Sequence, residues 1–215
     1  MIKIEKGKEP PELMAYRKQK FSSYEDMPKN VHDAVVASLM KEQGCICAYC
    51  MRKIPQKHKE PAVTIEHIDA QSLTDIDRAL DYRNMLAVCN GNRGCGNKKN
   101  MTCDAKRQNE KLYVNPLDGR TLHSIEYKRD GTIFSLDDRV NKDLNVTLNL
   151  NCPEVGLTES RCSALREIQV ALSKRKQDGD IKFQCKKFLE FYRHQEVKTP
   201  YVGILIWWLE KKINS

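Results

Sequence analysis

Apolar side chains recur every three or four residues in residues 31–43 and 157–176, and this spacing predicts amphipathic helices. Two more helices are expected, over residues 181–194 and in the apolar segment that opens after Pro200. Gly44 follows the first stretch and is a good helix stop. Thr158 can cap the second stretch, which Asp178-Gly179-Asp180 separates from the third. Helices are therefore expected to dominate the C-terminal part of the chain.

A second pattern, of short β-rich stretches between turn residues, predicts strands. Residues 124–128 and 132–136 flank Arg129-Asp130-Gly131, and this order predicts a β-hairpin. Helices combined with short antiparallel strands predict an α+β fold.

The patterns divide the chain into three segments. Residues 1–44 are expected to form an N-terminal arm, punctuated by prolines, and a helix. Residues 45–105 hold most of the candidate chemistry, and residues 106–215 are expected to form the hairpin and a mostly helical C-terminal region. One domain with additions, or two small domains, would fit this length.

Composition narrows the classes of function. The 215 residues carry a formal net charge of +8, and 31% of them are charged. This balance favours a polyanionic partner, nucleic acid first. The chain begins with closely spaced charges, so no secretory signal is expected. The longest apolar run, 201–209, is too short to span a membrane, and a cytoplasmic location is expected.

Nine cysteines in such a chain indicate metal ligands before disulfides. Four of them form two pairs: Cys47 with Cys50, and Cys89 with Cys95. Four converging thiolates predict a closed structural zinc site. Cys45 and Cys103 are alternatives for one ligand position each. The other three are expected to be ordinary buried cysteines: Cys152, Cys162 and Cys185.

Between the two cysteine pairs lies a candidate catalytic segment. The first half of residues 62–69 is β-rich, which places Glu66 and His67 at a strand end. A second strand is expected within 81–89, with Asn84 at its entrance. A neutral imidazole can take a proton from water near pH 7, so His67 is a candidate general base. The other histidines are expected to be structural: His32, His58, His123 and His194.

The order of these residues resembles the HNH endonuclease family, whose core is a ββα-metal fold. In that family an acidic residue and a histidine end the first strand, as Glu66 and His67 do here. One asparagine precedes the second strand, as Asn84 does, and another follows the last cysteine at a helix start, as Asn97 does. The resemblance covers residues 47–99. It implies a metal-dependent phosphodiester hydrolase with structural zinc knuckles.

One catalytic Mg²⁺ or Mn²⁺ would serve this reaction, and carboxylate and amide oxygens suit such an ion. Glu66 and Asn97 are expected to hold it, while Asn84 braces the strand-end loop through its backbone. Lys98 and Lys99 would contact phosphate. Three nearby residues are alternatives to the two metal ligands: Asp69, Asn92 and Asn100.

The flanks of this segment resemble the PtuB nucleases of Septu anti-phage systems. The resemblance lies in residues 4–13, 41–52 and 148–151. It implies a role in bacterial antiviral defence beside a PtuA-like ATPase. In some such systems a retron, with its reverse transcriptase and DNA, is a further partner.

Two other functions remain compatible with the sequence: a zinc-binding nucleic-acid module without catalysis, and a scaffold that regulates an ATPase. HNH sites cut DNA most often, and RNA, including tRNA, is an alternative substrate. No helix-turn-helix or stacking platform is recognisable in the sequence. We therefore expect little intrinsic readout of base edges.

Overall fold

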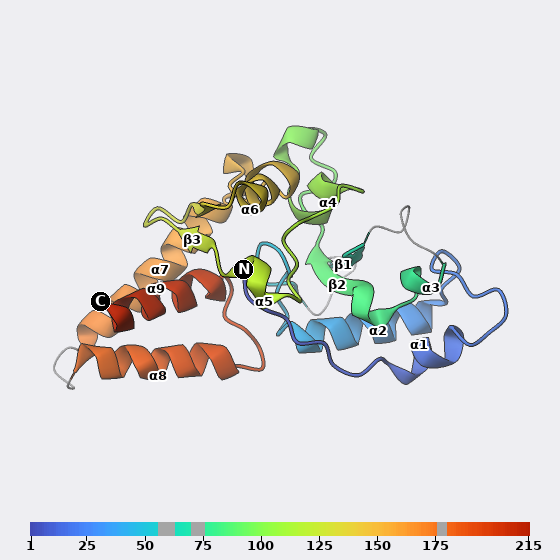
Figure 1. The fold of residues 1–215 in the computed structure, drawn as a ribbon, viewed down its shortest axis with the longest axis horizontal. Coiled ribbons are helices and arrows are strands. Elements are labelled where there is room, and N and C mark those ends of the chain that lie inside the picture. The colour runs from blue at the N-terminus through green and yellow to red at the C-terminus, as the bar shows by residue number, and fades with distance from the viewer. Residues whose placement is uncertain (56–62, 70–75, 176–179) are drawn as a thin grey trace.

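The computed structural model describes residues 1–55, 63–69, 76–175 and 180–215 (Figure 1). Three features of the sequence analysis lie outside these ranges: position 62 of the expected strand, His58, and the Asp178-Gly179 break. The described residues combine helices with two antiparallel strand pairs, so the α+β class is compatible with the structure.

Two helices form the N-terminal segment, α1 (Pro11–Tyr16) and α2 (Lys29–Glu42), and they pack against each other. Proline opens or precedes both helices, where its fixed φ suits the first turn and its missing N–H costs nothing. The side chains that α2 buries follow the helical spacing: Val31, Val35, Leu39 and Met40. The helix expected over 31–43 is thus confirmed, with its start two residues earlier.

The central segment is built on one antiparallel strand pair, β1 (Val63–His67) and β2 (Met85–Cys89), in which His67 faces Met85. All five residues of β2 are buried, because α2 and α4 pack against this strand. Four short helices accompany the pair: α3 (Ile76–Ala79), η2 (Tyr82–Asn84), η3 (Lys98–Asn100) and α4 (Cys103–Arg107). The chain does turn after Cys95, but only into the 3₁₀ turn η3; the α-helix starts at Cys103.

A small hairpin and several short helices connect the centre to the C-terminal region. The hairpin consists of β3 (Ile125–Tyr127) and β4 (Ile133–Ser135), which confirms the hairpin expected around the 129–131 turn. The accompanying helices are α5 (Gly119–Leu122), α6 (Asp138–Lys142), the π-helix η4 (Asp143–Thr147) and the 3₁₀ helix η5 (Pro153–Val155).

Three longer helices complete the chain on the side away from α1 (Figure 1): α7 (Leu157–Lys174), α8 (Ile181–His194) and α9 (Val202–Asn214). All three were expected from the sequence. The cap prediction was wrong, because Gly156 occupies the N-cap position in a left-handed conformation and Thr158 lies inside α7. Within the described residues, none of the helices combines the length and the hydropathy of a membrane span.

The three expected segments share one continuous apolar core. It joins Leu13 and Val35 of the N-terminal helices to Leu86 of β2 and to Leu165 and Leu205 of the C-terminal helices. The strand pair and its cysteines are therefore supported from both ends of the chain.

Candidate metal centre and active site

Four buried cysteines bring their sulfur atoms together beside β2: Cys47, Cys50, Cys89 and Cys103. All four ligand atoms lie within 4.8 Å of one another. The Cys50–Cys89, Cys89–Cys103 and Cys47–Cys103 sulfur distances are 3.7, 3.8 and 3.9 Å. A zinc ion with Zn–S bonds of 2.3 Å sets tetrahedral S···S edges of about 3.8 Å. The spacing thus fits one tetrahedral metal ion such as zinc.

The charge state of the cluster also suits a metal ion. Hydrogen bonds from the neighbouring thiols, that of Cys103 foremost, lower the pKa of Cys89. Burial raises the pKa of Cys50 well above its usual value, so these thiols resist ionising together unless a cation compensates. A bound divalent ion would provide that compensation.

The fourth ligand position differs from the sequence prediction. Cys95 is exposed, and its sulfur donates to the carbonyl oxygen of Asn97 at 3.1 Å, whereas Cys103 lies in the cluster. The reason is a loop that closes at its base, where the N–H of Thr102 donates to the carbonyl of Gly91 at 2.8 Å. This closure returns the chain to Cys89 at residue 103. Cys95 is left in the middle of the loop, away from the metal centre.

The loop base is held from the C-terminal region as well. The side-chain amide of Asn149 donates to the carbonyls of Lys99 and Met101, both at 2.9 Å. The N–H of Cys103 donates to the carbonyl of Leu148, also at 2.9 Å. Contacts from about fifty residues further along the chain therefore help to fix the fourth ligand.

Gly91 is required at this closure for two reasons. Its φ is +60°, and a Cβ atom would lie 2.1 Å from the carbonyl oxygen of Thr102. We expect Gly91→Ala to lower the free energy of unfolding by about 3 kcal/mol or more in urea titrations. Gly96→Ala is the matched control, because its φ is +73° but nothing lies within 4 Å of the added atom. We expect that control to cost only about 1 kcal/mol; equal losses would argue against the steric reason.

His67 is the last residue of β1, and one of its ring nitrogens is hydrogen-bonded. Its Nε2 lies 2.9 Å from the carbonyl oxygen of Ala79. A carbonyl can only accept, so Nε2 carries the proton and Nδ1 keeps its lone pair. Burial lowers the pKa of His67, which favours the neutral imidazole. The ring of Tyr24 packs edge-on against the imidazole, with the centroids 4.6 Å apart.

Glu66 lies on the other side of the strand end and is buried against Arg107 and Tyr49. The Tyr49 hydroxyl donates to Oε1 of Glu66 at 2.9 Å, and Arg107 forms an ion pair with the same oxygen. Burial raises the pKa of Glu66 to about 8; Arg107 opposes this rise, and the Asp104 carboxylate adds to it. Two carboxyl groups therefore lie close enough to interact at this strand end.

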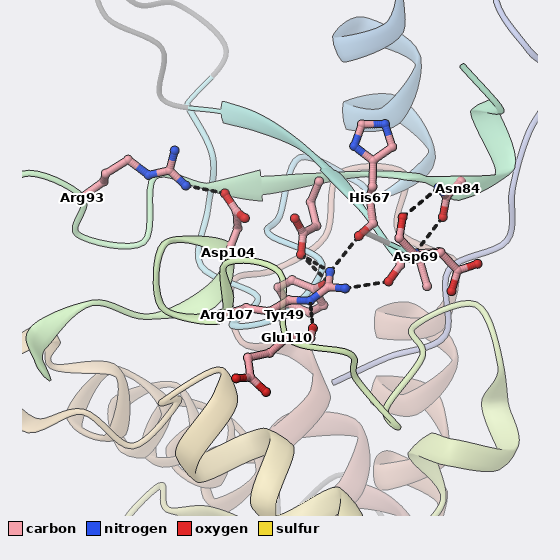
Figure 2. A network of polar contacts seen from close by, with 10 residues as sticks. Tyr49, His67, Asp69, Asn84, Arg93, Asp104, Arg107 and Glu110 are labelled. Carbon is pink, nitrogen blue, oxygen red and sulfur yellow. Dashed lines mark hydrogen bonds and ion pairs between the residues drawn. The ribbon is translucent and has the colours of Figure 1, made fainter. Parts of the chain in front are cut away.

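Arg107 organises the strand end (Figure 2). Besides Glu66, its guanidinium donates to three backbone carbonyls: Nη1 to His67 at 2.7 Å, Nη2 to Ile68 at 2.6 Å and Nε to Glu110 at 2.8 Å. It is almost fully buried, with 1% of its surface exposed. A flat fork of donors is suited to holding several acceptors at fixed angles. Arg107 thus ties α4 to the end of β1.

Asp104 lies in the first turn of α4, directly after a cysteine of the cluster. Its carboxylate forms an ion pair with Arg93, whose guanidinium is half exposed (Figure 2). The Asp104 charge acts on both Glu66 and His67. Position 104 therefore supplies a second carboxylate that the sequence analysis did not consider.

Asn84 makes the backbone contacts that the brace interpretation requires. Its side-chain oxygen accepts from the N–H of Asp69 at 2.9 Å, and its amide donates to the carbonyls of Asp69 and Arg78, both at 3.1 Å. The N–H of Ile68 donates to the Asn84 carbonyl at 2.9 Å. Asp69, the alternative to Glu66 as metal ligand, pairs with Arg78 instead.

Asn97 lies away from Glu66, His67 and Asp104. It is exposed, and its side-chain oxygen caps η3 by accepting from the N–H of Lys99 at 3.0 Å. The alternative residue Asn92 donates to the carbonyl of Asn100 at 3.0 Å, so Asn92 and Asn100 form a hydrogen bond within the loop. Lys98 and Lys99 are exposed on the same loop. The structure thus does not bring Asn97 to Glu66, since the fold places Cys103, not Cys95, before the α-helix.

No protein-family model and no curated protein matches this chain. The chemistry of the site must therefore be inferred from its own residues.

Sequence reasoning missed three residues of the site: Tyr24, Asp104 and Arg107. Asp104 had a partial signal, because it is an acidic residue directly after Cys103, one of the alternative zinc ligands. Tyr24 and Arg107 had none, since their contacts join segments about forty residues apart.

Proposed function

We propose that this protein is a metal-dependent endonuclease of the HNH kind that hydrolyses phosphodiester bonds in nucleic acid. One observation carries the proposal: His67, whose Nε2 is held by the Ala79 carbonyl, ends the same strand as Glu66, and the Glu66 carboxyl interacts with that of Asp104. The order β1, β2, α4 on a four-cysteine cluster is the order expected of a ββα-metal core.

His67 supplies the general base in this proposal. With its Nε2 proton held by Ala79, Nδ1 can accept a proton from an attacking water. The lowered pKa keeps the ring neutral at physiological pH. Packing by Tyr24 fixes the ring orientation.

Glu66 and Asp104 are the residues that would hold Mg²⁺ or Mn²⁺. Both offer hard oxygen ligands, and two adjacent carboxyls favour a cation between them. When bound, such an ion would supply charge neutralisation at the phosphate and the leaving oxygen. Arg107 and Asn84 hold the backbone around the two ligands. Exposed Arg93, Lys98 and Lys99 are suited to contact phosphates.

Asp104→Asn tests the reassigned metal ligand. We expect it to lower Mg²⁺-dependent cleavage by about 100-fold, because an amide cannot replace the negative charge. Asn97→Ala, the matched control, should keep near-normal activity. The measurement is the initial rate of plasmid nicking against Mg²⁺ concentration. Loss of activity in Asn97→Ala with none in Asp104→Asn would restore the original assignment.

The substrate class should be sought with plasmid, single-stranded DNA and total tRNA, each with Mg²⁺ or Mn²⁺. The competing proposal is a zinc-supported binding module without catalysis. The ion pair of Glu66 with Arg107 favours it, because that pair uses one carboxylate oxygen. Binding without cleavage of any substrate under either metal ion would support the binding module and contradict the nuclease.

The defence role and a PtuA-like ATPase partner are further proposals that rest on the resemblance of the flanks. The chemistry proposed for His67 does not depend on them.

A further inference from the structure

Phe21 is an exposed aromatic residue in the loop between α1 and α2. Its exposed fraction is 87%, although burial of an aromatic ring is normally a large source of stability. Its φ is +67°, a left-handed conformation that is an outlier for a bulky residue. The ring thus gains little from the fold, and its backbone is strained to present it.

The turn that carries Phe21 is ordered. The buried Tyr16 hydroxyl donates to the carbonyl of Ser23 at 2.8 Å and accepts from the N–H of Ser23 at 3.2 Å. The N–H of Gln19 donates to the carbonyl of Tyr16 at 2.9 Å. The ring is therefore presented by a closed turn, which lowers the entropy lost when a ligand binds.

Basic side chains share the turn with this ring. Arg17, Lys18 and Lys20 are exposed in the same turn, and Lys20 Nζ lies 5.0 Å from the centre of the Phe21 ring. A groove of about 910 Å³ lies alongside α1. The cations that line it are Lys8, Arg17, Arg78 and Arg83; its acidic residues are Glu9 and Asp81.

Residues next to the Phe21 turn and residues next to the groove both contact the candidate active site. Tyr24, three residues after Phe21, packs against His67, and the charge of Asp104 adds to the burial that raises the pKa of Tyr24 to about 12. On the groove side, Arg78 precedes Ala79, whose carbonyl holds the His67 ring. The Phe21 turn is therefore joined, through Tyr24 three residues further on, to a side chain that packs against His67.

We propose that the turn formed by residues 17–21 is a stacking platform for an unpaired base of the nucleic-acid substrate. Exposed aromatics among cations are the recognition chemistry of single strands, in which rings stack on bases and cations follow the phosphates. A duplex keeps its bases stacked internally and offers no such face. The inference rests on the proposed function and specifies its substrate as nucleic acid with an unpaired segment next to the cut.

Binding in buffer without added Mg²⁺ or Mn²⁺ tests the platform without cleavage and without a chelator that would remove the structural zinc. Fluorescence anisotropy of the full chain with a labelled single-stranded oligonucleotide would compare three variants with the wild type. Phe21→Asn removes the ring while suiting a left-handed backbone, Phe21→Trp keeps stacking, and Leu136→Ala is the control for an equally exposed side chain, at 84%. We expect Phe21→Asn to weaken single-strand binding about 10-fold, with Phe21→Trp and Leu136→Ala unchanged and duplex binding little affected.

Normal single-strand binding by Phe21→Asn would overturn the platform, and so would absence of oligonucleotide binding by the wild type. The two proposals can fail separately. Phe21-dependent binding by a wild type that cleaves nothing would retain the platform and reject the nuclease. Cleavage by a wild type whose binding ignores Phe21 would retain the nuclease and reject the platform.

Discussion

Cys103→Ser is expected to release the metal ion and to lower the melting temperature by about 10 °C or more. Structural zinc contributes on the order of 10 kcal/mol to the folding of small zinc domains, and losing ~4 kcal/mol of that corresponds to about 10 °C in a chain of this length. Serine is a poor zinc ligand, and the buried position 103 offers it no water. Metal content by mass spectrometry and thermal unfolding by circular dichroism are the two measurements.

Cys95→Ser is the matched control, because Cys95 lies on the same loop but is exposed. We expect it to keep one metal ion per chain and a melting temperature close to that of the wild type. If Cys95→Ser lost the metal while Cys103→Ser kept it, the loop closure described for Gly91 and Thr102 would be wrong.

His67→Ala should abolish most cleavage while leaving the metal centre intact. Removal of a general base lowers rates by about 100- to 10,000-fold. Because the ring packs against Tyr24 and is held by Ala79, the variant also loses some stability. Zinc content and a circular dichroism spectrum must therefore show that it is folded before its rate is compared.

His32→Ala provides the histidine control, since His32 is half exposed on α2. It should cleave at the wild-type rate. Equal rates for His67→Ala and the wild type, on a substrate that requires Mg²⁺, would reject the proposed mechanism even though the protein remained a nuclease.

Local sequence patterns were sufficient to predict the main helices and the β3–β4 hairpin. The apolar spacing in α2 and α7, the apolar segments of α8 and α9 and the turn residues between β3 and β4 are all local features. These helices and strands were therefore predictable. The Cys47-x-x-Cys50 knuckle was equally readable, because its two ligands share one turn.

Contacts between distant segments were not predictable. The choice between Cys95 and Cys103 depends on closure of a loop at Gly91 and on support from Asn149, neither of which a cysteine spacing reveals. The same is true of Arg107, which reads as one more basic residue in a basic chain yet is buried at the strand end.

The prediction of Asn97 as a metal ligand depended on the prediction of the fourth zinc ligand. The asparagine was selected because it follows Cys95, so the choice of metal ligand depended on the choice of the fourth cysteine. With Cys103 in that place, the neighbouring polar residue is Asp104 instead.

The loop between Gly91 and Thr102 has an evolutionary consequence. Because it is closed at its base by the Thr102–Gly91 hydrogen bond and held there by Asn149, residues could be inserted or deleted between positions 92 and 98 without moving Cys89 or Cys103. Its basic side chains, Arg93, Lys98 and Lys99, could therefore diversify between lineages while the metal centre stayed constant. Grafting loops of other lengths between positions 91 and 102 would show how far this surface can change while the metal centre is retained.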